Sequence, residues 1–266
     1  VTLFNNQLNY KIMKTKNILL VILLVIGAKV SFAQLSDKDW KYLVVREDVV
    51  KPSMTNAYEA SLSDLSAFLT GNNVHGVKYI TQLQDNLHYT HITTVKKLGE
   101  FDEGLSAYIR GDKKSAEFDL IWSDLNETIE TYSYYVVKYE PELSYVPDGK
   151  VWLEDAPYRR WNYVYFQPGK EKEVDKLIMS WKNLYKDKGV KYGFRVYSGV
   201  IGIDRPVIIF TTWAENPFTY QENMQENIEL LGEEGTILWM GMMGLAREVE
   251  TIEGWYLPQY SYMPEN

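Results

Sequence analysis

The chain contains no cysteine and only three histidines among its 266 residues: His75, His88 and His91. Disulfide bonds and thiolate metal sites are therefore excluded. His88 and His91 stand three residues apart in one strand region, so strand alternation turns them to opposite faces and away from a shared metal. Glycine-rich phosphate loops, Gly-x-Ser-x-Gly elbows and His-Glu-x-x-His zinc helices are also missing. We therefore expect neither a metal nor a cofactor.

Positive charge is scarce outside the N-terminal segment. The whole chain has 28 basic and 36 acidic residues. Four of the lysines and none of the acids lie in residues 1–33, so residues 34–266 carry 28 − 4 = 24 basic against 36 acidic residues, a net charge of −12. Nucleic acids and anionic membranes bind basic surfaces. We therefore expect neither as a partner.

The one long hydrophobic run lies near the N-terminus, at residues 18–26. Lys14 and Lys16 precede it, and Ser-Phe-Ala at 31–33 follows it. This order is typical of a secretory signal peptide, and nine residues are too few for a bilayer span of about 20. We expect translation to start at Met13, residues 1–33 to be upstream residues plus the signal peptide, and cleavage to follow Ala33. The product would be secreted or periplasmic, without a membrane anchor.

Two distant segments repeat one another. Residues 139–147 read Tyr-Glu-Pro-Glu-Leu-Ser-Tyr-Val-Pro and residues 256–264 read Tyr-Leu-Pro-Gln-Tyr-Ser-Tyr-Met-Pro, identical at five of nine positions. Three shorter matches occur in the same order: Trp-x-Tyr at 40–42 and 161–163, Gly-Val-Lys-Tyr at 76–79 and 189–192, and Thr-Thr at 93–94 and 211–212. These matches predict a tandem duplication, with one unit in 34–147 and the other in 158–266.

Both halves show the same order of elements. In the second half, apolar residues at 174, 177, 178, 181, 184 and 185 follow one face of a helix, and 161–166 alternate as a strand does. Further strands are predicted at 192–200, 207–213 and 255–262, with a helical region over about 222–249 that Gly232 and Gly235 interrupt. The first half predicts strands at 40–46, 77–84, 89–96 and 132–139, and helices around 58–69 and 118–129. Each unit is thus β-α-β-β-α-β, a ferredoxin-like arrangement.

A ferredoxin-like sheet carries helices on one face and must cover the other. Trp161, Tyr163 and Tyr165 alternate with Val164 and Phe166, so we expect the aromatic side to face a second sheet. Over residues 38–264 the element order and the duplication resemble the dimeric α/β-barrel superfamily, which includes the NIPSNAP and EthD groups and antibiotic-biosynthesis monooxygenases. The resemblance implies an α+β fold in which two tandem ferredoxin-like units face each other as an intramolecular barrel. It also implies a cavity for a small, often aromatic molecule.

Arg195 is the candidate for recognising such a molecule. It lies in mid-strand on the same face as Tyr197, and a guanidinium there is able to bind a carboxylate through two hydrogen bonds. The alternative is an exposed arginine paired with an acid. The full set that we expect to line the barrel interior is Tyr42, His91, Tyr163, Tyr165, Arg195, Tyr197 and Trp213. No residue is assigned a catalytic role.

Two functions remain open. The first is an exported protein, monomer or homodimer, that binds a small apolar or aromatic molecule between the two units without catalysis. The alternative is a cofactor-free monooxygenase or isomerase, with a tyrosine, an arginine or His91 polarising an aromatic substrate. The scarcity of histidine and the lack of paired acid and base groups favour the first.

Overall fold

The computed structural model describes residues 40–101, 109, 111–147 and 156–264. The predicted signal peptide and its cleavage site lie outside these residues. None of the helices within them has the length and apolar content to cross a bilayer.

Eight antiparallel strands close into one barrel in the order β1-β3-β2-β8-β5-β7-β6-β4. The first half consists of β1 (Tyr42–Val50), α2 (Thr55–Gly71), β2 (Ile80–Gln84), β3 (His88–Val95), α3 (Asp112–Thr128) and β4 (Ile129–Tyr139). The second consists of β5 (Tyr158–Phe166), α4 (Glu171–Asp187), β6 (Arg195–Ile201), β7 (Val207–Ala214), α5 (Pro217–Leu245) and β8 (Ala246–Tyr256). Each half has the strand order fourth-first-third-second. This order confirms the predicted α+β fold of two ferredoxin-like units.

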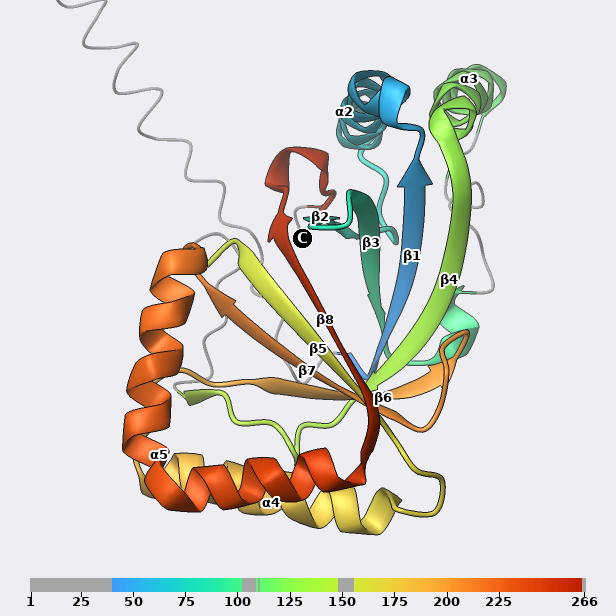
Figure 1. Cartoon of the computed structure of the whole chain (residues 1–266). Coiled ribbons are helices and arrows are strands. Elements are labelled where there is room, and N and C mark those ends of the chain that lie inside the picture. The colour runs from blue at the N-terminus through green and yellow to red at the C-terminus, as the bar shows by residue number, and fades with distance from the viewer. Residues whose placement is uncertain (1–39, 102–108, 110, 148–155, 265–266) are drawn as a thin grey trace, which may run out of the picture. The chain divides into compact units, whose positions relative to one another are not determined.

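The two halves meet at two seams, where β2 pairs with β8 and β4 pairs with β6. Figure 1 shows α2 and α3 beside the strands of the first half, and α4 and α5 beside those of the second. Gly254 lies at the first seam, and a Cβ atom there would stand 2.5 Å from the carbonyl oxygen of Leu83. The close approach of β8 to β2 therefore requires glycine.

The interior of the barrel is a packed aromatic and aliphatic core. Its buried members are Trp40, Leu43, Val45, Ile92, Val137, Tyr139, Trp161, Tyr163, Tyr197, Val207 and Ile209. Ile80 of β2 and Ile252 of β8 pack against them, so every strand contributes. Further apolar clusters lie between each half-sheet and its own helices. The barrel thus has an inner face and a helix-covered outer face.

The nine-residue repeat performs the same structural task in both halves. The hydroxyl of Ser144 donates to the carbonyl of Glu140 and accepts from the amide of Val196, at 2.8 and 2.9 Å. Ser261 bonds Leu257 and Thr81 in the same way and at the same distances. The tyrosine after each serine ties the segment to the other half, just past the end of its first helix, since Tyr145 donates to the Val190 carbonyl after α4 and Tyr262 to that of Val74 after α2.

The shorter sequence matches do not mark equivalent positions. The amide of Val74 bonds the carbonyl of Leu69 as the amide of Val190 bonds that of Tyr185, and the residues before them, Asn73 and Gly189, both have positive φ. Gly189 therefore corresponds to Asn73 and not to Gly76. Likewise Tyr79 pairs with Tyr262 as Phe194 pairs with Tyr145, so Tyr79 corresponds to Phe194 rather than Tyr192.

The boundary between α5 and β8 also differs from the prediction. The helix ends at Leu245, and Val249 lies within β8, which ends at Tyr256. Pairing with β5 along nearly the whole of that strand holds these residues extended. The predicted interruption is present at Gly232, whose φ of 57° lies outside the helical region. Figure 1 shows the two parts of α5 running in different directions.

Candidate functional site

Five of the seven predicted ligand-binding residues lie on the inner face of the barrel. Trp161 belongs to the inner core, and alternation along β5 places Tyr163 and Tyr165 on the same side. Trp161 stands opposite Thr211, and Thr211 opposite Arg195. Tyr197 is two residues after Arg195, and Trp213 is two residues after Thr211, so alternation places both on the inner face as well.

The middle of the barrel is packed around these tyrosines. The hydroxyls of Tyr135 and Tyr163 lie 3.0 Å apart, and burial raises the pKa of Tyr163 well above its ordinary value. Tyr165, nearer the rim, donates to the carboxylate of Glu250 at 3.4 Å. The tyrosines in the middle therefore act as neutral core residues that satisfy one another.

Tyr42 and His91 do not line the interior, which corrects the prediction. Leu43 and Val45 point inward. Tyr42, which directly precedes Leu43, therefore points outward, where Lys41 lies over its ring. Ile92 also points inward, and His91 therefore faces helix α2. There it joins a polar network that the sequence analysis did not identify.

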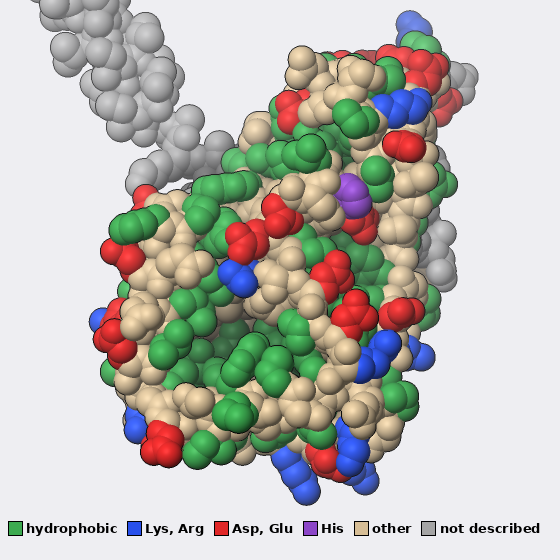
Figure 2. Space-filling view, viewed as in Figure 1, with side chains coloured by type: hydrophobic (Ala, Val, Ile, Leu, Met, Phe, Trp, Pro, Cys, Tyr) green, Lys and Arg blue, Asp and Glu red, His purple; other side chains and the backbone are tan. Residues whose placement is uncertain are grey.

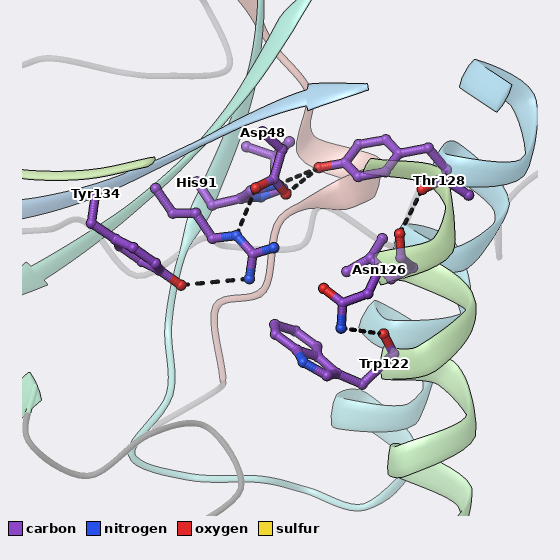
Figure 3. A network of polar contacts seen from close by, with 10 residues as sticks. Asp48, His91, Trp122, Asn126, Thr128 and Tyr134 are labelled. Carbon is purple, nitrogen blue, oxygen red and sulfur yellow. Dashed lines mark hydrogen bonds and ion pairs between the residues drawn. The ribbon is translucent and has the colours of Figure 1, made fainter. Parts of the chain in front are cut away.

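His91, on β3, lies at the centre of this network, and its partners come from β1, β2 and α2 (Figure 3). The hydroxyl of Tyr58, from α2, donates to Asp48 Oδ2 at 2.9 Å and lies 2.8 Å from His91 Nε2. His91 Nδ1 lies 3.0 Å from the hydroxyl of Thr81, which donates to the carbonyl of Tyr260 at 2.6 Å. Asp48, Tyr58 and Thr81 are fully buried.

The hydroxyl of Tyr58 has two partners within hydrogen-bond distance. The Thr81 hydrogen bonds the Tyr260 carbonyl, so Thr81 accepts from His91 Nδ1, which must carry a hydrogen. The Tyr58 hydroxyl has one hydrogen and lies within bonding distance of both Asp48 and His91 Nε2. If Tyr58 bonds Asp48, Nε2 must also be protonated; if it bonds His91, Nε2 is an acceptor. The second arrangement has one proton fewer on His91, so passing between them requires loss or gain of that proton as well as rotation about the tyrosine C–O bond.

Arg46 completes the network beneath α3. Its Nε donates to Asp48 Oδ1 at 2.7 Å, and its Nη1 lies 3.5 Å from the Tyr134 hydroxyl. The guanidinium carbon lies 5.0 Å from the ring centres of both Trp122 and Tyr132. Its Nη2 is buried and has no hydrogen-bond partner among the residues that the structure describes. A buried donor of this kind is available to an acceptor oxygen of a ligand.

Electrostatics keeps Asp48 ionised and Tyr58 neutral. Burial raises the pKa of Asp48, but the hydrogen bonds and charges of His91 and Arg46 outweigh burial and leave the pKa below its ordinary value. Burial, together with the Asp48 charge, raises the pKa of Tyr58 far above that of a free tyrosine. Tyr58 is therefore a neutral hydrogen-bond donor, and not a resting base.

The second half has apolar residues in place of four members of this network, Asp48, Tyr58, Thr81 and His91. The strand registers and the paired serine contacts make Asp48 equivalent to Val164, Thr81 to Val196, and His91 to Phe210. The shared bonds at the helix ends make Tyr58 equivalent to Val174. Because the same sheet and helix pack with valine and phenylalanine in the second half, the fold itself does not require the polar set. Its presence in the first half points to function.

The second half instead exposes apolar surface. Figure 2 shows hydrophobic side chains around a hollow beside α5 and the strands of this half. The exposed hydrophobic residues of the second half include Trp239 of α5 and Val249 and Trp255 of β8. The nearby arginine Arg160 is already paired with Glu253, at 2.7 Å. We therefore take the network around His91 and Arg46 as the candidate site.

Sequence spacing gave little signal for this site, since its side chains come from six separate elements. Alternation alone indicates that Arg46 and Asp48 share a face of one strand. Within the described ranges, no group of three or more histidine, aspartate or glutamate side chains is placed to hold a metal ion.

Comparisons with known proteins identify the fold. No protein-family model and no curated protein matches the sequence. Among solved structures, a proposed monooxygenase from Lactobacillus acidophilus NCFM is similar with a TM-score of 0.54 and 10% identity, over 85% of this chain and 97% of the other.

Two further structures agree. An anthrone oxidase-like protein gives a TM-score of 0.54 at 11% identity, over 84% of this chain and 94% of that one. A proposed monooxygenase from Fusobacterium nucleatum subsp. nucleatum ATCC 25586 gives 0.52 at 12%, over 82% and 93%. Together with the closed barrel and its strand order, these likenesses show that the chain has the fold of the dimeric α/β-barrel superfamily, with both units in one chain.

Proposed function

We propose that the chain binds a small planar aromatic molecule with an acceptor oxygen, a ketone or a phenol, beside Arg46 in the first half. The observation that carries this proposal is the buried Nη2 of Arg46, which has no acceptor among the described residues. Trp122 and Tyr132, whose ring centres each lie 5.0 Å from the guanidinium carbon, supply flat apolar surfaces. Tyr132 and Tyr134 are partly exposed, so the ligand reaches Arg46 by passing beside them.

The charges at the site favour a neutral ligand over an anion. Asp48 already pairs with Arg46 at 2.7 Å and neutralises its charge. A ligand oxygen therefore gains one hydrogen bond from a charged donor, which is worth about 1.5–3 kcal/mol. The names of two structural relatives as proposed monooxygenases and of a third as anthrone oxidase-like suggest polycyclic ketones as first probes.

Anthrone and 9,10-dihydroanthracene test this proposal, because they share a ring system and only anthrone has the carbonyl. Fluorescence titration should show anthrone binding at least 10-fold more tightly, a difference of about 1.4 kcal/mol. Arg46→Lys keeps the charge beside Asp48 but removes Nη2 and the planar group, and should abolish this preference. Arg205→Lys, at an exposed position, is the control. An unchanged preference in Arg46→Lys would contradict the proposal.

The Asp48–Tyr58–His91 arrangement favours a second candidate, a cofactor-free monooxygenase. In this reaction bound anthrone loses a proton from its methylene carbon to His91 through Tyr58, while Arg46 stabilises the enolate oxygen. Dioxygen then oxidises the enolate, and anthraquinone and water are released. Anthraquinone formation without added metal, lost in His91→Phe while anthrone still binds, supports this candidate. Binding without turnover leaves the non-catalytic binding protein.

We also propose that the protein is exported. The support is the order of lysines, apolar run and Ser-Phe-Ala in residues 14–33. In that case the ligand is met outside the cytoplasm. The tandem arrangement of two units with the same strand order, and the shared nine-residue segment, support an origin by duplication.

A further inference from the structure

Two buried donors inside the barrel have no acceptor among the residues that the structure describes: Arg159 Nη2 and Trp40 Nε1. Arg159 is 4% exposed and projects inward from β5, two positions before Trp161. Its Nη1 donates to the backbone carbonyl of Tyr158 at 3.1 Å. A guanidinium buried without an anionic partner is strongly unfavourable. Two donors without acceptors indicate that an acceptor-rich group belongs here.

A second positive charge lies near the first. The Arg195 guanidinium carbon lies 6.0 Å from the ring centre of Trp40 and 5.8 Å from that of Trp213. Trp213 stands directly opposite Arg159 in the pairing of β5 with β7. Burial, and then repulsion from Arg195, lowers the pKa of Arg159 to about 9. The two guanidinium groups therefore share one electrostatic environment.

Gln84 is an uncharged acceptor on the same side of the sheet as Arg159. Arg159, Gly254 and Gln84 stand side by side across β5, β8 and β2. The buried Oε1 of Gln84 has no hydrogen-bond partner within the described part of the chain. An amide oxygen supplies a hydrogen bond but no charge, so Gln84 is unable to neutralise the guanidinium.

We propose that Arg159, assisted by Arg195, forms an anion site inside the barrel that binds the carboxylate of a small aromatic acid. Arginine donates two parallel hydrogen bonds to a carboxylate. Trp40 and Trp213 provide the surfaces on which an aromatic ring packs. The site is separate from the one beside Arg46, because Arg159 points into the barrel with Trp161, whereas Arg46 alternates with the inward-pointing Val45 and faces the helices. This proposal adds Arg159 to the predicted ligand-binding residues Tyr197, Arg195 and Trp213, which also lie on the inner face.

Benzoate, acetate and benzamide test the proposal on the full chain. Benzoate should raise the melting temperature and change the tryptophan fluorescence, whereas benzamide, of the same shape without the charge, should do neither. Acetate should bind at least 10-fold more weakly than benzoate. Equal effects of benzoate and benzamide would overturn the anion site, and equal affinity for acetate and benzoate would overturn its aromatic part.

Arg159→Met is the matching variant, with the exposed Arg205→Met as control. It should weaken benzoate binding at least 10-fold, and the control should not. Because the variant removes a buried charge, it should melt at a higher temperature than the natural chain when no anion is added. Benzoate affinity in Arg159→Met within twofold of the natural chain would overturn the assignment. A melting temperature of Arg159→Met that, without anion, is equal to or below that of the natural chain would also overturn the assignment.

Discussion

Asp48 of β1 and Val164 of β5 occupy equivalent positions in the two halves, and each is no more than 2% exposed. One half thus buries a carboxylate where the other buries an isopropyl group. Buried ion pairs can often be replaced by apolar side chains at no loss of stability. The carboxylate and its partners are therefore better explained by binding or proton transfer than by folding.

Removing the carboxylate alone should be costly. Asp48→Asn leaves the Arg46 charge buried without a counter-charge, so we expect the free energy of unfolding to fall by about 3 kcal/mol. A combined Arg46→Met, Asp48→Val, Tyr58→Phe and His91→Phe variant, which removes the buried charges together with their partners, should lose less. Urea denaturation measures both. A larger loss in the combined variant would mean that the fold requires the network.

Acid should remove the contribution of Asp48. The pKa of Asp48 is lowered in the folded protein by His91 and Arg46, which outweigh burial, whereas an unfolded aspartate has a pKa of about 3.9. Stability from this group is therefore fully present above about pH 4 and is lost as the pH falls below it through the folded-state value. The stability difference between the natural chain and Asp48→Asn, measured from pH 7 to 3, should shrink in that range. A constant difference would contradict this.

The serines of the nine-residue repeat should be equally important. Ser144→Ala and Ser261→Ala each leave a buried strand amide, that of Val196 or Thr81, without its acceptor. We expect each to cost about 1–3 kcal/mol in urea denaturation. Ser63→Ala, on the exposed side of α2, is the control and should cost little. If only one of the two serines mattered, the segments would not be structurally equivalent.

The architecture was predictable because long-range order is repeated within the chain. The duplication and the β-α-β-β-α-β pattern imply two facing units, and alternation along β5 places Tyr163 and Tyr165 on the inner face. Tyr42 was misplaced because the Trp-x-Tyr match suggested equivalence with Tyr163, whereas the strand registers make it equivalent to Tyr158.

The polar network was not predictable for a different reason. His91 meets Tyr58 and Asp48 only because β1 and β3 pair in one register and α2 crosses above them. A sequence shows the phase within a strand, but not which face of one strand adjoins which face of the next. Arg159 was missed because the strand was predicted to begin at residue 161, whereas β5 begins at Tyr158.

Export should be visible in the mass of the secreted protein. Expressed in a bacterium, the chain should leave the cytoplasm with Gln34 as its first residue. Ala33→Lys places a large charged residue at the cleavage position and should leave the leader attached. Intact-mass analysis distinguishes the two forms. Secreted natural protein that still carried residues 14–33 would contradict the proposed signal peptide.

The seam between β2 and β8 should be sensitive to a single methyl group. In Gly254→Ala the new Cβ would stand 2.5 Å from the Leu83 carbonyl oxygen, a backbone atom that moves only with its strand. We expect a loss of about 1–3 kcal/mol and faster hydrogen exchange of the Leu257 amide, which bonds Thr81 beside this seam. Gly244→Ala is the matched control, because its Cβ meets nothing within 4 Å on α5 and helical alanine should stabilise by about 0.4–1 kcal/mol. Equal stability of the two variants would show that the halves are not held together by this close approach.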